Sequence, residues 1–217
     1  MNKTQVISQI RKIGIVPVIR ADSEDEARQL IEAIFEGGIS IFEVTMTVPN
    51  AVLLIKTLVA DFAEKAIIGA GTVLDAATAR NCLAAGAKFI VSPVLKLDVI
   101  EICRRENVAV FPGALTPTEI VAAWQAGADA VKIFPANAVG GASFLKAIKT
   151  PLPNIELMPT GGVTLATIGD FIRAGAIAVG VGSDLADVRA IRAGESEKIT
   201  KAARAFVKAV NEARLSG

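Results

Sequence analysis

A lysine stands in the middle of a short apolar run, DAVKIFPA, at residues 129–136. Side chains alternate along a strand, so Lys132 points to the face opposite Val131 and Ile133. That β-branched pair suits an interface with helices, which turns Lys132 toward the interior of the fold. A buried lysine loses hydration, which favours the neutral amine, and a neutral amine can form a Schiff base with a carbonyl compound. The alternative is a lysine paired with a buried carboxylate for structure alone.

A carboxylate stands in a similar run. In ISIFEVT, residues 39–45, Glu43 points to the face opposite Phe42 and Val44. An inward carboxylate near an inward Lys132 could carry protons to and from a bound water or substrate. A buried ion pair without chemistry is the alternative, and the two interpretations are compatible.

Glycines follow two other apolar runs, as Gly161-Gly162 and Gly182-Ser183. Glycine lets backbone N–H groups approach an anion closely, and a helix beginning at Ser183 would add its positive end. These pairs predict a phosphate site, unless the glycines only serve tight turns.

Two further groups could hold a small carboxylate. Gly71 and Thr72 offer backbone N–H groups and a hydroxyl, and Arg20 offers a guanidinium for bidentate pairing. The alternatives are a Thr72 hydroxyl that caps its own turn and an Arg20 that is a solvated loop residue.

All these residues belong to short apolar runs that alternate with helical patterns. Eight runs predict buried parallel strands at residues 14–20, 39–45, 66–71, 88–92, 108–112, 130–135, 155–160 and 176–180. Helical patterns lie near residues 23–36, 50–63, 75–85, 95–106, 117–126, 141–149, 165–174 and 196–214. The residues before Gly14 predict an extra helix. Typical N-cap residues begin several of the helices, among them Ser23, Asn50, Asp75 and Thr116.

Strict alternation of strand and helix favours an α/β fold, a parallel sheet with helices outside it. Eight units predict a (β/α)8 TIM barrel, in which the C-terminal ends of the strands hold the active site and the last two loops often bind phosphate. A doubly wound open sheet is the alternative, although no GxGxxG opens a helix after the first strand. The chain has no linker or low-complexity segment, so residues 1–217 are expected to form one domain.

Composition narrows the classes of function. The 217 residues carry 23 basic and 22 acidic side chains without a basic block, which argues against nucleic acid or an acidic membrane surface as a partner. Histidine, the commonest metal ligand and general base, is absent, so a zinc site is nearly excluded. Cys82 and Cys103 predict two buried free thiols. With no signal peptide and no apolar run long enough to span a membrane, the expected location is cytoplasmic.

Seven motifs, in order, resemble one enzyme family. They are IVPVIRAD, FEVTMTVPNA, IIGAGTV, FIVSP, FPGALTPTE, VKIFPA and MPTGGV. From about residue 15 to residue 183 the chain is similar to 2-keto-3-deoxy-6-phosphogluconate (KDPG) aldolase, a family that also contains 4-hydroxy-2-oxoglutarate aldolase activity. The resemblance implies a class I aldolase on a (β/α)8 barrel, a homotrimer, and no need for a metal or other cofactor.

The resemblance also implies roles for single residues. Lys132 would form the imine with pyruvate, and Glu43 would be the general acid/base that works with a bound water. The other matched positions would contact the substrate: Gly71 and Thr72 its carboxylate, Thr160 its reacting oxygens, Pro93 and Phe134 the pocket wall, and Gly161, Gly162, Gly182 and Ser183 its phosphate.

The chain departs from the family pattern at two places. Many members read EVTLR where this chain reads EVTMT, so Thr47 stands in the position of an arginine that contacts the substrate carboxylate. Members with threonine there often end their first strand in arginine, so we expect Arg20 to take over the carboxylate. The family's Ser-Pro-Gly reads SPV here, and Val94 is expected to narrow the pocket or change the choice of substrate.

The expected activity is the reversible cleavage of KDPG to pyruvate and glyceraldehyde 3-phosphate. Alternative substrates are 4-hydroxy-2-oxoglutarate and the C4 epimer, 2-keto-3-deoxy-6-phosphogalactonate. Outside the aldolases, the residues also fit a phosphosugar isomerase with Glu43 as its base, or a barrel that binds a phosphorylated metabolite without catalysis. Metal-dependent epimerases need histidine ligands and are disfavoured.

Overall fold

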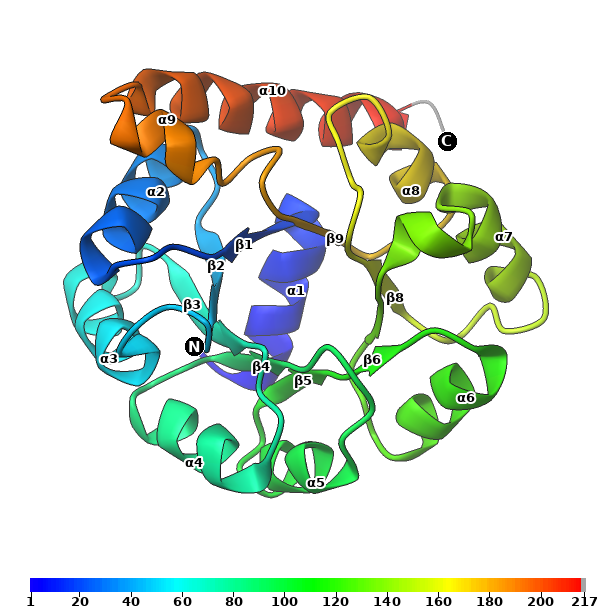
Figure 1. Ribbon diagram of the computed structural model, residues 1–217. Helices are drawn as coiled ribbons and strands as arrows, with labels where there is room; N and C mark the ends of the chain where they lie inside the picture. The colour runs from blue at the N-terminus through cyan, green and yellow to red at the C-terminus, as the bar shows by residue number, and fades with distance from the viewer. Residues whose placement is uncertain (216–217) are drawn as a thin grey trace.

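The computed structural model describes residues 1–215 as a ring of parallel strands surrounded by a ring of helices (Figure 1). The strands are β1 (Ile15–Ile19), β2 (Ile41–Thr45), β3 (Ile67–Gly71), β4 (Phe89–Val91), β5 (Ala109–Phe111), β6 (Gly113–Ala114), β7 (Val131–Ile133), β8 (Leu157–Pro159) and β9 (Val179–Val181). The helices are α1 (Lys3–Ile13), α2 (Glu24–Glu36), α3 (Ala51–Phe62), α4 (Ala76–Ala84), α5 (Leu97–Arg105), α6 (Pro117–Gln125), α7 (Ala142–Lys149), α8 (Ile168–Arg173), α9 (Val188–Arg192) and α10 (Ser196–Leu215), with a 3₁₀ turn, η1 (Ala136–Val139).

The strands close into a barrel. One parallel sheet runs in the order β5-β4-β3-β2-β1-β9 and a second in the order β6-β7-β8. Only Pro112, which has no N–H to give to the ladder, separates β5 from β6, so these two form one stretch of chain. A parallel bridge between Thr160 and Gly180 joins the ends of β8 and β9. The (β/α)8 barrel predicted from eight alternating units is therefore confirmed, and the open-sheet alternative is wrong.

Each strand has two buried faces, because helices cover the outside and side chains fill the inside. Phe42 and Val131 pack in the outer core against helices, whereas Ile41 and Met158 belong to a smaller inner core. This division follows the alternation expected along a strand. Burial of each large apolar side chain contributes about 1.5–3 kcal/mol, so strand register is strongly specified.

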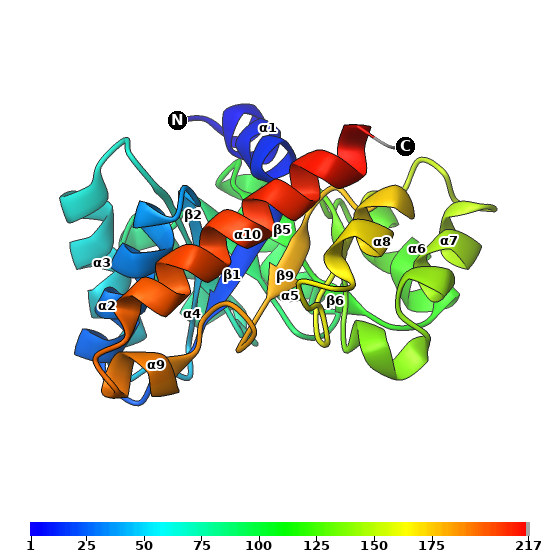
Figure 2. The same cartoon turned by 90° about the horizontal axis from the view of Figure 1, so that it is seen from above.

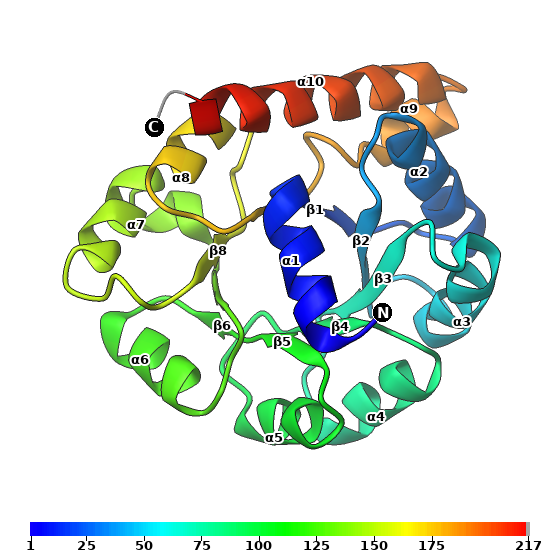
Figure 3. The same cartoon turned by 180° about the vertical axis from the view of Figure 1, so that it is seen from behind.

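The extra N-terminal helix α1 lies across one end of the barrel, as Figure 3 shows. Its buried residues Val6 and Ile10 belong to the inner core, so the helix closes that mouth. Arg214, near the end of α10, donates to the carbonyl of Lys12 over 2.6 Å and ties the two ends of the chain together. Figure 2 shows α1 at the end of the barrel opposite α9.

Most of the residues predicted to begin helices form N-cap hydrogen bonds. Ser23, Asp75 and Thr116 each accept a hydrogen bond from an N–H three residues on. Asn50 precedes α3 in a left-handed conformation and makes no side-chain cap; its amide instead donates to Glu24 Oε1. Among residues 1–215, no helix is both long enough and apolar enough to cross a bilayer.

Candidate active site

Lys132 and Glu43 meet inside the barrel, 89 positions apart in sequence. Lys132 Nζ lies 3.3 Å from Glu43 Oε1, and the two side chains are 3% and 0% exposed. The strand register places Lys132 between Gly113 of β6 and Met158 of β8. Two ionisable groups in such a dry place are costly to desolvate, so this pair is a candidate for chemistry as well as for structure.

Two glycines make room for the polar groups in the barrel. A Cβ on Gly71 would lie 2.1 Å from Glu43 Oε1, and a Cβ on Gly180 would lie 2.2 Å from Thr160 Oγ1. Neither glycine has a positive φ, so the need is for space rather than for an unusual backbone. Glycine at these positions lets Glu43 and Thr160 point into the site.

Two oxygens close to this space are buried without a partner. Within residues 1–215, neither Glu43 Oε2 nor Thr160 Oγ1 makes a hydrogen bond. A buried oxygen left unsatisfied costs about 1–3 kcal/mol. A bound molecule that donates to these oxygens would remove that cost, so they are candidates for the polar wall of a ligand site.

Thr72, directly after β3, has a strained backbone. Its φ of +59° is in the left-handed region, which a β-branched residue adopts at a cost of about 1–3 kcal/mol. Its hydroxyl makes no hydrogen bond among the described residues, so it does not cap its own turn. The strain holds a free hydroxyl at the C-terminal end of the barrel beside Gly71.

Phe134 and Pro93 lie close to the lysine. The centre of the Phe134 ring is 5.5 Å from Lys132 Nζ, a distance at which the ring face attracts a cation. Pro93 packs its carbonyl against Gly113, the residue paired with Lys132: a Cβ there would lie 2.2 Å from the Pro93 oxygen. Val94 follows and is 48% exposed.

The two predicted phosphate loops lie next to each other, since the bridge between Thr160 and Gly180 joins the strands that carry them. Gly161 and Gly162 have φ values of +92° and +73°, which favour glycine. The backbone N–H groups of Gly162 and Ser183 have no backbone partner in residues 1–215, whereas Gly161 follows directly on the bridge to Gly180. These free donors suit an anion.

The helix expected to begin at Ser183 is absent, so that part of the prediction is wrong. Instead, the N–H groups of Leu185 and Ala186 turn back to the Gly182 carbonyl, at 3.0 and 2.8 Å. The next helix, α9, begins at Val188, where the Asp187 carboxylate accepts from a backbone N–H and fixes the start. Any anion at this loop would bind to turn N–H groups and not to a helix end.

Arg20 and Thr47 line one cavity of about 370 Å³ at the ends of β1 and β2. Asp22 and Arg192 also line it. The Arg20 side chain is exposed and makes no hydrogen bond or ion pair within residues 1–215. This position suits an anion-binding arginine and equally a solvated one.

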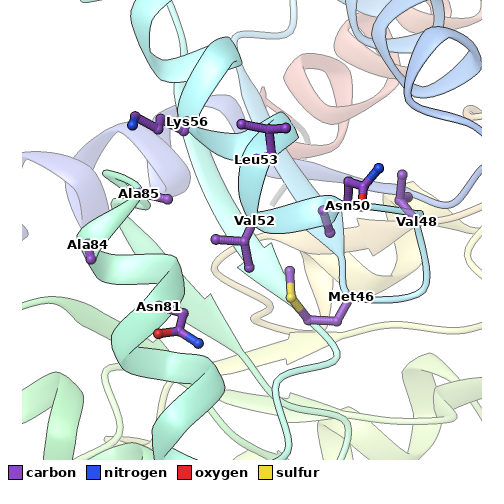
Figure 4. A pocket seen from close by; sticks show the side chains of 10 residues that line it. Met46, Val48, Asn50, Val52, Leu53, Lys56, Asn81, Ala84 and Ala85 are labelled. Carbon is purple, nitrogen blue, oxygen red and sulfur yellow. The ribbon is translucent and has the colours of Figure 1, made fainter.

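A separate cavity of about 700 Å³ lies between α3 and α4 (Figure 4), and Lys132 is not among its lining residues. Met46, Val52 and Leu53 form its apolar side, and Lys56 and Asn81 lie at its edge. Lys56 is the one ionisable side chain among the residues that line this cavity.

The remaining thiols and carboxylates do not form a centre of their own. Cys82 and Cys103 are free and buried, as predicted, and burial raises their pKa to about 11 and about 12. Across residues 1–215, no three side chains of the metal-ligating types His, Cys, Asp and Glu come together.

Three residues near the site were not singled out from the sequence. Ser92 is fully buried and its hydroxyl accepts from the Val94 N–H; Asn137 packs against Gly162; and Gly180 makes space for Thr160. A polar residue at the end of an apolar run was a usable signal for Ser92. The contacts of Gly180 and Asn137 depend on side chains distant in sequence.

Known proteins share this sequence and fold. The family model for KDPG and KHG aldolase matches residues 6–202. A 2-dehydro-3-deoxy-6-phosphogalactonate aldolase of Escherichia coli is 36% identical over 93% of this chain and 97% of its own length. A 2-dehydro-3-deoxy-phosphogluconate aldolase of Haemophilus influenzae is 32% identical over 94% and 95%.

Among solved structures, KDPG aldolase from Legionella pneumophila, with pyruvate captured as a covalent carbinolamine, superposes with a TM-score of 0.85. It is 30% identical over 92% of this chain and 97% of its own. Family model, relatives and fold agree along nearly the whole chain, and this chain therefore belongs to the KDPG and KHG aldolase family.

Proposed function

We propose that this chain is a class I aldolase that reversibly cleaves KDPG to pyruvate and glyceraldehyde 3-phosphate through an imine on Lys132, without a metal or other cofactor. The observation that carries the proposal is the buried pair: Lys132 Nζ is 3.3 Å from Glu43 Oε1, at the centre of the barrel. A nucleophilic amine with a carboxylate in hydrogen-bond reach is the arrangement that imine chemistry requires.

The first half of the reaction makes an electron sink. The neutral amine of Lys132 attacks the C2 ketone, and the ketone oxygen leaves as water to give an iminium ion. Glu43 accepts the proton of the C4 hydroxyl through a bound water, and the C3–C4 bond breaks with its electron pair moving to C3. The aldehyde leaves, and an enamine of pyruvate stays on Lys132.

The second half restores the enzyme. Glu43 returns a proton to C3, and water adds to C2 and frees pyruvate from Lys132. Thr160 suits the reacting oxygens, because its buried hydroxyl lacks a partner in the described chain. The iminium ion stabilises the carbanion, the task that a metal ion would otherwise perform.

The rest of the substrate would be held at the strand ends. Gly71, Thr72 and Arg20 bind the pyruvate carboxylate, and Thr47 lines the same cavity as Arg20. Pro93 and Phe134 wall the pocket. Backbone donors of the loops at 161–162 and 182–183 bind the phosphate.

The C4 epimer is a second candidate substrate, since the Escherichia coli relative named for the phosphogalactonate is 36% identical. Measuring kcat/KM for both epimers and for 4-hydroxy-2-oxoglutarate separates the three. We expect the phosphorylated compounds to be preferred, because the phosphate loops offer free N–H donors.

Borohydride trapping with pyruvate, followed by peptide mass spectrometry, tests the mechanism. A reduced pyruvyl adduct on Lys132 is expected, and none on Lys132→Met. Lys88→Met, which removes an exposed lysine from the same barrel, serves as the matched control and should keep the adduct. If folded wild-type protein gave no adduct on Lys132, the imine mechanism would be wrong, and an isomerase or a metabolite-binding barrel would become the better proposal.

We also propose a cytoplasmic homotrimer. Supporting it, exposed apolar side chains gather on three consecutive units of the barrel: Leu53, Leu74, Val94 and Leu97. The cavity of Figure 4 opens on the same flank. Light scattering on wild type should give three chains. Leu53→Glu should lower the mass, whereas Leu165→Glu, at a leucine of another unit that is 46% exposed against 55% for Leu53, should not.

A further inference from the structure

Two consecutive hydrogen bonds connect the Thr47 hydroxyl to the backbone of the barrel through the Thr45 hydroxyl. Thr45 Oγ1 lies 2.9 Å from the carbonyl oxygen of Ile19, and 2.6 Å from Thr47 Oγ1. Thr45 is fully buried, and Thr47 is exposed at the cavity that Arg20 also lines. The hydrogen-bonded chain therefore leads from the buried end of β1, one residue before Arg20, out to the surface of that cavity.

The direction of the protons in this chain follows from chemistry. A carbonyl oxygen can only accept, so Thr45 must donate its single hydroxyl proton to Ile19. Thr45 then has only lone pairs left, so Thr47 must donate its own proton to Thr45. The Thr47 oxygen consequently faces the cavity with lone pairs alone. It can accept from a guanidinium, but it has no proton to offer a carboxylate.

A group of ion pairs around Arg192 leaves the Arg20 guanidinium without a carboxylate partner. Two carboxylates shortly after Arg20 in the sequence, Asp22 and Glu26, both pair with Arg192 of α9, at 2.6 Å each. The Asp22 N–H also donates to Glu26 over 3.1 Å. With these acids occupied, Arg20 stays unpaired and available to an anion.

From this geometry we propose that Thr47 is a positioning residue for Arg20: when a substrate carboxylate draws the guanidinium into the cavity, Thr47 accepts one of its N–H groups and so aims the remaining N–H donors at that carboxylate, a contact that the described residues do not make by themselves. Thr47 thus does not replace the family arginine by touching the substrate. It supports the arginine that has moved to the end of β1. The inference rests on the proposed carboxylate role of Arg20.

The test is a double-mutant cycle read by the exchange of pyruvate C3 protons with deuterium. That exchange needs the imine and the carboxylate site but no aldehyde. Arg20→Ala should raise the KM for pyruvate. Thr47→Val should raise it about tenfold with kcat little changed, because a hydrogen bond to a charged group has an effect of that order. Thr47→Ser, which keeps the hydroxyl, should restore a near wild-type KM.

The decisive result is the double variant. If Thr47 acts through Arg20, Arg20→Ala with Thr47→Val should match Arg20→Ala alone. Additive losses would mean that Thr47 contacts the carboxylate itself, and an unchanged KM in Thr47→Val would mean that Arg20 needs no support; either result overturns the inference. Thr150→Val, at an exposed threonine of the outer ring, is the control and should change nothing.

Failure of the underlying function would look different. Wild-type protein without any pyruvate exchange would overturn the aldolase proposal and the inference together. Normal exchange with an unchanged KM in Arg20→Ala would leave the imine chemistry intact and remove only the role of Arg20 and its support.

Discussion

Replacing Gly71 by alanine should disable the site by steric means alone. The new Cβ would lie 2.1 Å from Glu43 Oε1 and 2.6 Å from Glu43 Cδ, whereas ordinary contact begins at 3.4 Å. The carboxylate must therefore move by more than 1 Å, out of its 3.3 Å contact with Lys132. Overpacking of this kind typically costs about 1–3 kcal/mol, which corresponds to a melting temperature about 2–12 °C lower for a chain of this length.

The activity should suffer more than the stability. A displacement of about 1 Å in a catalytic group can cost about a hundredfold in rate, so with the role proposed for Glu43 the pyruvate exchange of Gly71→Ala should fall by that order. Gly169→Ala is the matched control, because its Cβ would meet only the flexible end of Arg173 at 3.1 Å. That variant should keep both its melting temperature and its activity.

Removing the Glu43 side chain tests whether its steric contact with the new Cβ causes the loss of stability in Gly71→Ala. In a Glu43→Ala background the obstacle is gone, so Gly71→Ala should then cost little further stability. Calorimetry on the four proteins of this cycle measures the coupling. An equal loss in both backgrounds, or a Gly71→Ala enzyme with normal exchange, would show that the contact between Gly71 and Glu43 does not control the site.

Three further predictions concern residues other than Gly71 and Glu43. The hydrogen bond from Arg192 lowers the pKa of Glu26 below its ordinary 4.5, so the stabilisation by this pair is present at neutral pH and is lost as the pH falls through the folded-state pKa. The difference in melting temperature between wild type and Glu26→Gln should therefore shrink below pH 4.5. A difference that stays constant with pH would show that the ionised Glu26 is not its source. Arg192→Met should raise the KM for pyruvate several-fold, since Asp22 would be free to pair with Arg20, and an unchanged KM in the exchange assay would argue against that competition. Because burial raises the pKa of the Cys82 and Cys103 thiols, both should resist a thiol reagent at pH 8 in the folded protein and react together in urea. Rapid modification of either thiol in the folded protein would contradict this prediction.

Periodicity along the chain was sufficient to predict the barrel and the inward direction of its two ionisable residues. Alternation puts Lys132 and Glu43 opposite the branched residues that face the helices, and closure of the ring then brings them together. Local patterns did less well where the chain turns. At Ser183 a polar residue after glycine looked like a helix start, but the turn there is closed by the Gly182 carbonyl, and Asp187 caps the helix instead.

Contacts between distant residues were beyond reach of the sequence. The need for glycine at 71 comes from Glu43, and the proton direction at Thr47 comes from the Ile19 carbonyl. Neither partner lies in the same motif, since register between strands decides both. Thr72 shows the same limit, because nothing in GAGT announces a positive φ at its last residue.

The position of α1 across one mouth of the barrel also determines by which end the protein can be attached to a surface. Because α1 closes that mouth and the end of α10 is bonded to it, both ends of the described chain lie at the mouth opposite α9 (Figure 2). The candidate site residues Thr72 and Thr160 follow the C-terminal ends of their strands, at the other mouth. A tether at either end would leave the mouth at the C-terminal strand ends facing away from the surface to which the protein is attached. Enzyme anchored to a bead through residue 1 or residue 215 should therefore meet dissolved substrate as freely as enzyme in solution.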